Sequence, residues 1–120
     1  MKEVKKIDFS EYDFDILEAG NAKKFETELA KVVKINEESK GYVSMSKVVL
    51  ANCNAVCEFF DNILGEGTAK KFFGGVMHIG QTSEVFRQFV EYTNTQAERF
   101  AEAQKPEENR EQRRSKSKKQ

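Results

Sequence analysis

The first patterned stretch of the chain, residues 4–17, reads VKKIDFSEYDFDIL and alternates apolar with polar positions. A period of two is typical of a strand that buries one face. The alternation changes phase between Phe9 and Tyr12, which places a turn at Ser10-Glu11. The pattern therefore predicts a short β-hairpin or an extended arm at the N-terminus.

After Gly20 the apolar positions recur every three or four residues, which is the spacing of one helical face. Asn21 is a candidate cap for the first helix, and Thr82 or Ser83 for the last, because these side chains accept from first-turn N–H groups. The last helix should end by Gln104, before the backbone restriction imposed by Pro106. The fold class is mainly α, with about four helices, at residues 22–39, 44–64, 68–73 and 83–104.

A sharp corner is predicted within residues 59–75, FFDNILGEGTAKKFFGG. Gly65 is suited to end the long second helix, because glycine accepts the left-handed backbone often found there. Thr68 is the candidate cap of the short third helix. Gly74 and Gly75 should end that helix after about two turns.

Each side of the corner carries an aromatic pair. Adjacent helical residues point about 100° apart, so one buried face cannot hide both rings of a pair. We expect Phe60 and Phe72 to be buried, and Phe59 and Phe73 to face outward. The predicted core comprises Leu29, Val56, Phe60, Ile63, Phe72, Phe86 and Phe89.

Val76 and Met77 lie in a predicted loop between glycines, where apolar side chains are hard to explain by packing. A loop adapts its shape, and methionine suits surfaces that accept varied partners. The alternative is that both residues complete the core. Together with Phe59 and Phe73, they form the candidate partner-binding surface for an apolar helix.

Length and charge divide the chain into a helical domain with its N-terminal arm, residues 1–104, and a disordered basic tail, residues 105–120. The tail has seven Lys/Arg and three Glu, a net charge of +4, and the rest therefore carries −4 in a chain of net charge zero. No apolar run is long enough to span a bilayer, so we expect a soluble cytoplasmic protein.

The tail supplies an alternative function, a small nucleic-acid-binding or regulatory module. Its cations could contact phosphates. No aromatic residue is interleaved to stack on bases, which favours a solubilising role over specific nucleic-acid binding. The residues that would carry the alternative are Arg110, Arg113, Arg114, Lys116, Lys118 and Lys119.

Residues suited to catalysis or metal binding are sparse. His78 is the single histidine, and no Ser/His or Cys/His spacing suggests a nucleophilic triad. Cys53, Cys57 and His78 are three candidate zinc ligands without a fourth at a suitable spacing. We interpret the cysteines as small apolar residues that fill space. We expect no enzymatic activity, no cofactor and no metal.

The order of the segments resembles a known family. An acidic aromatic arm, IDFSEYDFDILEA, precedes NAKKFE, then CEFFDNILGEGTAKKFFGG, EVFRQFVEYTNTQAE and a basic end, NREQRRSKSKK. Together these segments resemble the small tail assembly chaperones of long-tailed bacteriophages and prophages. The similarity covers nearly the whole chain and is most specific from the corner to the EVFRQFVEY helix.

The resemblance implies a non-enzymatic helical protein of the host cytoplasm. Such proteins bind the tape measure protein, a long apolar helical chain, and keep it soluble while tail-tube subunits assemble around it. The tape measure protein is therefore the expected partner, with the tail-tube protein as a second candidate. The resemblance also implies absence from the mature virion. The oligomeric state stays open, as does the existence of a longer form made by ribosomal frameshifting.

Overall fold

The computed structural model describes residues 6–104. This part of the chain is mainly helical, as the sequence predicts, and contains no strand. The elements in chain order are a 3₁₀ turn η1 (Phe9–Glu11) and the helices α1 (Ala19–Ser39), α2 (Met45–Leu64), α3 (Thr68–Phe73) and α4 (Ile79–Gln104).

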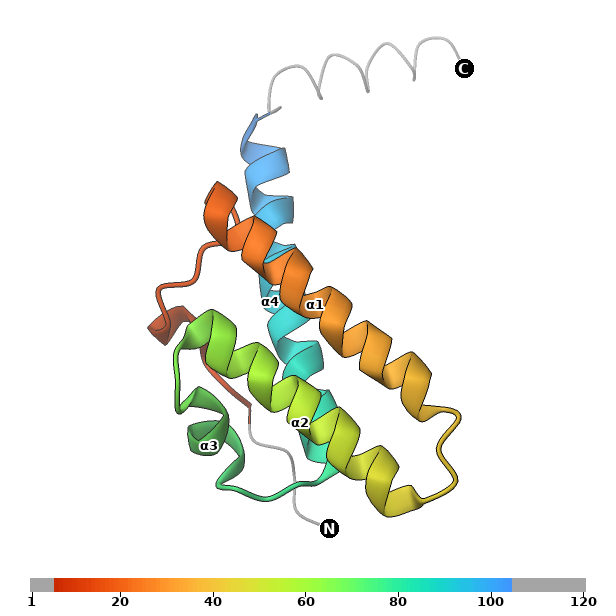
Figure 1. The fold of residues 1–120 in the computed structure, drawn as a ribbon. Helices are drawn as coiled ribbons and strands as arrows, with labels where there is room; N and C mark the ends of the chain where they lie inside the picture. The colour runs from red at the N-terminus through yellow and green to blue at the C-terminus, as the bar shows by residue number, and fades with distance from the viewer. Residues whose placement is uncertain (1–5, 105–120) are drawn as a thin grey trace, which may run out of the picture.

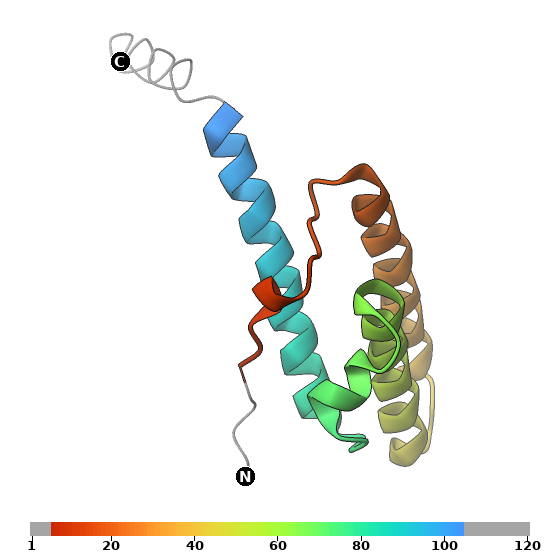
Figure 2. The ribbon, with the colours of Figure 1, turned by 90° about the vertical axis from the view of Figure 1, so that its left-hand side faces the viewer.

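The helices form two layers. Helices α1 and α2 lie side by side as an antiparallel hairpin, and α3 follows α2 at the corner (Figure 1). Helix α4 forms the other layer, and its C-terminal turns extend beyond the hairpin (Figure 2). The N-terminal arm runs along α4 before it crosses to the start of α1 (Figure 2). The arm, the corner and α4 therefore meet around one core.

The arm takes the extended alternative of the prediction, and no hairpin forms within residues 6–17. Its 3₁₀ turn, η1, lies at the predicted phase change. The Asp8 carboxylate caps this turn by accepting from the N–H of Ser10 at 3.1 Å. Phe9 and Phe14 are buried, so the arm contributes two rings to the core.

Helix α1 begins earlier than predicted, at Ala19. The cap is Glu18, whose carboxylate accepts from the N–H of Asn21 at 3.2 Å and from the N–H of Gly20. The prediction that Asn21 caps α1 is wrong. Asn21 lies inside the helix, and its Nδ2 donates to the carbonyl of Asp15 at 3.1 Å.

Helix α4 also begins earlier than predicted, at Ile79. The Nδ1 atom of His78 accepts from the N–H of Gln81 at 3.2 Å, as a capping side chain does. The prediction of Thr82 or Ser83 as the cap is wrong. The Thr82 hydroxyl is buried within the first turn and donates to the carbonyl of Ile79 at 3.2 Å.

The predicted corner is present, with one change in its capping. Gly65 follows α2 with φ 117°, and Gly74 follows α3 with φ 61°, so both positions need glycine. Thr68 is the first residue of α3 and not its cap, because its hydroxyl donates to the carbonyl of Gly65 at 2.6 Å. The Asp61 carboxylate instead accepts from the N–H of Ala69 at 2.9 Å.

Phe89 of α4 lies at the centre of the core and is fully buried. Val56 and Phe60 are also buried as predicted, whereas Leu29, Ile63, Phe72 and Phe86 are half-buried against the cluster. Every phenylalanine except Phe100 belongs to this cluster. The rings in contact with Phe89 are those of Phe9, Phe14, Phe25, Phe59, Phe60 and Tyr92.

The prediction that Phe59 and Phe73 face outward is wrong, because both rings are buried. The end of α2 is covered on two sides, so each ring of its aromatic pair has partners. Phe59 packs between the rings of Phe25 in α1 and Phe86 in α4, at centroid distances of 5.9 and 4.9 Å. The neighbouring Phe60 packs against the arm and α3 instead.

Candidate functional site

The predicted partner-binding surface is divided by the structure. Val76 and Met77 lie at the surface, with 56% and 39% of their areas exposed. Phe59 and Phe73 lie beneath the surface and support the corner from inside. Only the loop part of the predicted surface is therefore available to a partner.

Further exposed apolar side chains lie at the same end of the molecule. The connection between α1 and α2, the first half of α2 and the loop between α3 and α4 share one end in both views (Figures 1 and 2). We call their exposed side chains the apolar end; they are Tyr42, Val43, Met45, Leu50, Val76 and Met77.

Part of the apolar end is hollowed. A surface depression of about 650 Å³ is lined by Tyr42, Val43, Ser44, Lys47 and Leu50. Ser44 caps α2, as the predicted helix start suggests, by accepting from the N–H of Lys47 at 3.4 Å. The cap fixes the first turn of α2 beside the depression, whose lining is apolar apart from Ser44 and Lys47.

Sequence reasoning missed the α1–α2 side of this surface. Tyr42 and Val43 are apolar residues that follow Gly41 between two predicted helices, a pattern similar to that of Val76 and Met77 after Gly75. Met45, the first residue of α2, is 72% exposed although it continues the apolar stripe of that helix.

A buried amide, that of Asn52, holds the hairpin that carries this surface. Asn52 of α2 donates from Nδ2 to the hydroxyl of Ser39 at 2.9 Å and to the carbonyl of Val48 at 2.8 Å. Its Oδ1 accepts from Nδ2 of Asn36 in α1 at 3.2 Å. These bonds fix the register of α1 against α2 next to their connection.

A second polar link lies at the other end of the hairpin. The buried Glu28 carboxylate of α1 accepts from Nδ2 of Asn62 in α2 at 2.9 Å and pairs with Lys31 at 3.0 Å. Burial alone would raise the pKa of Glu28, but the bonds from Asn62 and Lys31 outweigh it, and the pKa lies below its ordinary value of 4.5. The charged carboxylate is therefore favoured by the fold.

Two glutamines of α4 hold the arm. The N–H of Ile7 donates to Oε1 of Gln88 at 3.0 Å, and the N–H of Ile16 donates to Oε1 of Gln96 at 3.1 Å. Nε2 of Gln96 also donates to the carbonyl of Phe14 at 3.3 Å. These side-chain amides bond the extended backbone much as a neighbouring strand would.

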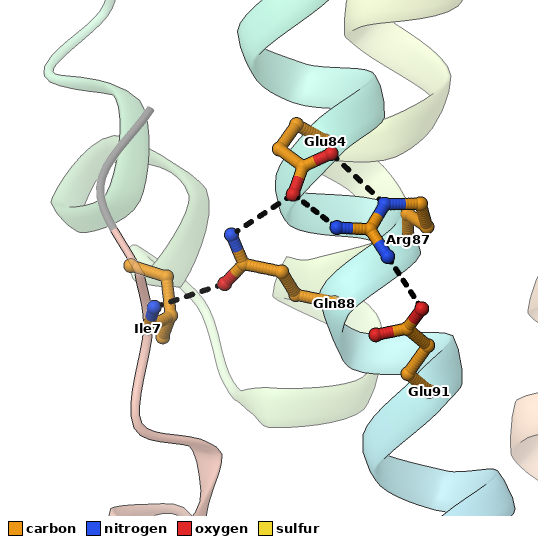
Figure 3. Close-up of polar contacts among 5 residues, drawn as sticks. All are labelled: Ile7, Glu84, Arg87, Gln88 and Glu91. Carbon is orange, nitrogen blue, oxygen red and sulfur yellow. Dashed lines mark hydrogen bonds and ion pairs between the residues drawn. The ribbon is translucent and has the colours of Figure 1, made fainter. Parts of the chain in front are cut away.

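Figure 3 shows how Gln88 is placed. Its Nε2 donates to Glu84 at 3.4 Å, while the guanidinium of Arg87 bridges Glu84 and Glu91 on the exposed side of α4. The hydrogen bond from Arg87 lowers the pKa of Glu84. The carboxylate therefore remains an acceptor for Gln88 at neutral pH, and Gln88 presents its oxygen to Ile7.

Between the arm and the C-terminal half of α4 lies a cavity of about 540 Å³, which we call the arm groove. Leu17 and Phe100, at 49% and 48% exposure, are its exposed apolar residues. Carboxylates and aromatic rings line it together. The lining residues are Ser10, Tyr12, Asp13, Phe14, Asp15, Leu17, Tyr92, Gln96, Arg99 and Phe100.

The cysteines and the histidine serve local structure. Cys53 is buried, and its Sγ lies 3.6 Å from the hydroxyl of Thr82. Burial raises the pKa of the Cys57 thiol, which disfavours the reactive thiolate. His78 caps α4. Among residues 6–104, no three His, Cys, Asp or Glu side chains are grouped as a metal site would require.

The tail cations from Arg110 to Lys119 lie outside the described residues, so their proposed phosphate contacts stay a prediction. Within the described part of the chain, no helix has the length and apolar character needed to cross a membrane.

Comparison with known proteins places the chain in one family. Neither the curated proteins nor the solved structures include a match to this sequence. Residues 8–117 match a family described as a family of unknown function, DUF6673. The match extends from the arm through all four helices, so it covers the apolar end and the arm groove. The chain therefore belongs to the DUF6673 family.

Proposed function

We propose that this protein is a non-enzymatic tail assembly chaperone of a long-tailed bacteriophage or prophage. It binds apolar helical segments of the tape measure protein in the host cytoplasm and is absent from the finished virion. The observation that carries the proposal is the apolar end, where six large apolar side chains of the α1–α2 connection, the first half of α2 and the α3–α4 loop are exposed. The resemblance of the segment order to such chaperones supports the identity of the client.

The chemistry of the apolar end suits a helical client. Each valine or methionine buried by a partner contributes roughly 1.5–3 kcal/mol, before the cost of association is subtracted. Met45 and Met77 are flexible and adapt to different client side chains. The depression beside Leu50 offers a place for one protruding apolar residue of an amphipathic helix.

The charged residues around the apolar end are consistent with reversible binding of a client. Lys47 lines the depression, and Lys40 lies just before the α1–α2 connection, paired with Glu37 at 3.0 Å. Charged neighbours keep the exposed apolar area bounded, which limits association between copies. A chaperone that releases its client during assembly needs such a limited surface.

Co-expression with the tape measure protein tests the site. We compare wild type with Val76→Ser, and use Val33→Ser as a matched control, because Val33 is 52% exposed on α1 outside the apolar end. The double variant Met45→Ser/Met77→Ser removes a larger part of the surface. Circular dichroism confirms that each variant remains helical.

Wild type and Val33→Ser should keep the tape measure protein in the soluble fraction. Val76→Ser should reduce the amount of soluble tape measure protein, and with the double variant most of the tape measure protein should be insoluble. If the folded double variant holds the client as well as wild type does, the apolar end is not the site. If wild type never increases the soluble client, the chaperone function itself is contradicted.

A further inference from the structure

Phe100 is exceptional among the aromatic residues, because it is the one phenylalanine outside the core cluster. It lies in the C-terminal part of α4, and 48% of its area is exposed. It faces the arm groove together with Tyr92 of the same helix and Phe14 of the arm. The groove therefore has an incompletely covered aromatic wall.

The other wall of the groove is acidic. Residues 8–18 of the arm carry five carboxylates and no Lys or Arg. None of these carboxylates takes part in an ion pair within the described part of the chain. Asp13 and Asp15 line the groove directly, opposite the single cation of its lining, Arg99.

Aromatic faces beside carboxylates are the surroundings that a guanidinium group favours. The planar group stacks on a ring through its face and donates in its plane to carboxylate oxygens. A lysine ammonium lacks the planar fork and is more strongly hydrated. The lining thus selects an arginine side chain over a general positive charge.

The chain itself supplies adjacent arginines close by. Helix α4 is described as far as Gln104, four residues after Phe100, or about 6 Å along the helix axis. Arg113 comes nine positions after Gln104, and this length of chain spans up to about 30 Å, which is enough to return to the groove. From Arg113 to Lys119 the sequence carries five cations and no carboxylate.

We propose that Arg113 and Arg114 insert their guanidinium groups into the arm groove of the same chain, between Phe100 and the carboxylates of Asp13 and Asp15. Tethering gives these arginines a high effective concentration at the groove, so a weak contact suffices. The contact uses side chains and requires no ordered tail backbone. The contact holds part of the tail's positive charge away from polyanions. The proposal does not depend on the proposed chaperone function.

Solution NMR of the full chain tests this contact through two reporters that line the groove, the Leu17 amide and the Phe100 ring. Arg113→Ser/Arg114→Ser should shift both signals. Lys118→Ser/Lys119→Ser removes the same charge from the same tail and should leave both signals close to wild type. Equal signals in wild type and the arginine variant would overturn the proposal.

Two further measurements define the contact. Arg113→Lys/Arg114→Lys keeps the charge and should shift the reporters nearly as far as the serine variant does; wild-type signals in this variant would overturn the guanidinium assignment. Dilution of wild type should leave the reporters unchanged. A shift on dilution would place the tail on a second copy and overturn the intramolecular contact.

Discussion

At the scale of single residues, Phe89 shows how closely the core depends on aromatic packing. Its ring contacts others from the arm, α1 and α2, so it joins elements that are far apart in the sequence. Its removal would leave a cavity that these surrounding rings cannot close without moving. Phe100, on the same helix, is 48% exposed and lies outside the core cluster, so it is a suitable comparison.

Phe89→Ala should therefore lower the free energy of unfolding by about 3–5 kcal/mol, a large share of a small domain's stability. Phe100→Ala should change it by less than about 0.5 kcal/mol, as surface substitutions usually do. Urea unfolding followed by circular dichroism measures both. Equal effects of the two substitutions would contradict the described core.

Glu28 gives a residue-level prediction about pH. The fold lowers the pKa of Glu28, so the ionised carboxylate stabilises the folded state. This contribution to the free energy of unfolding is fully present above pH 4.5, the ordinary pKa, and is lost as the pH falls through the pKa of the folded state. Glu28→Gln keeps a polar group but cannot ionise. The stability advantage of wild type over Glu28→Gln should thus be larger at pH 7 than at pH 3. An advantage that is the same at both values would show that the charge is not what stabilises this link.

Burial of single residues was only partly predictable from the sequence. The helical period identifies Val56, Phe60 and Phe89 correctly, because each lies in the middle of its apolar stripe. It fails for Phe59 and Phe73, since a period describes one buried face and the corner is covered on more than one side. Which faces are covered depends on how distant elements meet, and a local pattern does not contain that information.

At the scale of elements, the arm is held by hydrogen bonds that a sequence pattern does not reveal. Within the described residues 6–17, the alternation correctly indicates extended backbone on either side of η1. The partner of this backbone is a helix, whose glutamine side chains make the hydrogen bonds that a second strand would make. The helices themselves were predicted well within their interiors. Their starts at Ala19 and Ile79 were missed, because Glu18 and His78 are not the preferred capping residues.

Gln96→Ala should loosen the arm, because the N–H of Ile16 and the carbonyl of Phe14 lose their partner. The expected loss of stability is about 1–3 kcal/mol, the cost of leaving such groups unpaired. Hydrogen exchange at the Ile16 amide should become faster. Asn94→Ala changes an exposed residue of the same helix and serves as the control. Unchanged exchange at Ile16 in Gln96→Ala would contradict the role assigned to this glutamine.

At the scale of the whole molecule, the two surfaces lie at different ends of α4. The apolar end is beside its start, and the arm groove is along its C-terminal half. The sequence located only one part of the first surface, at Val76 and Met77, and none of the second. Both surfaces are assembled from segments far apart in the chain, which explains why residue spacing alone did not identify them.

The central claim is that the apolar end binds the tape measure protein. Hydrogen exchange measured by mass spectrometry on the purified complex and on the free protein tests it most directly. Exchange should slow at residues 41–45 and 74–78 and stay unchanged at residues 12–17 of the arm. Binding through apolar contacts should also persist at raised salt, unlike binding to phosphates. Protection that appears only outside the two apolar-end segments would contradict the account.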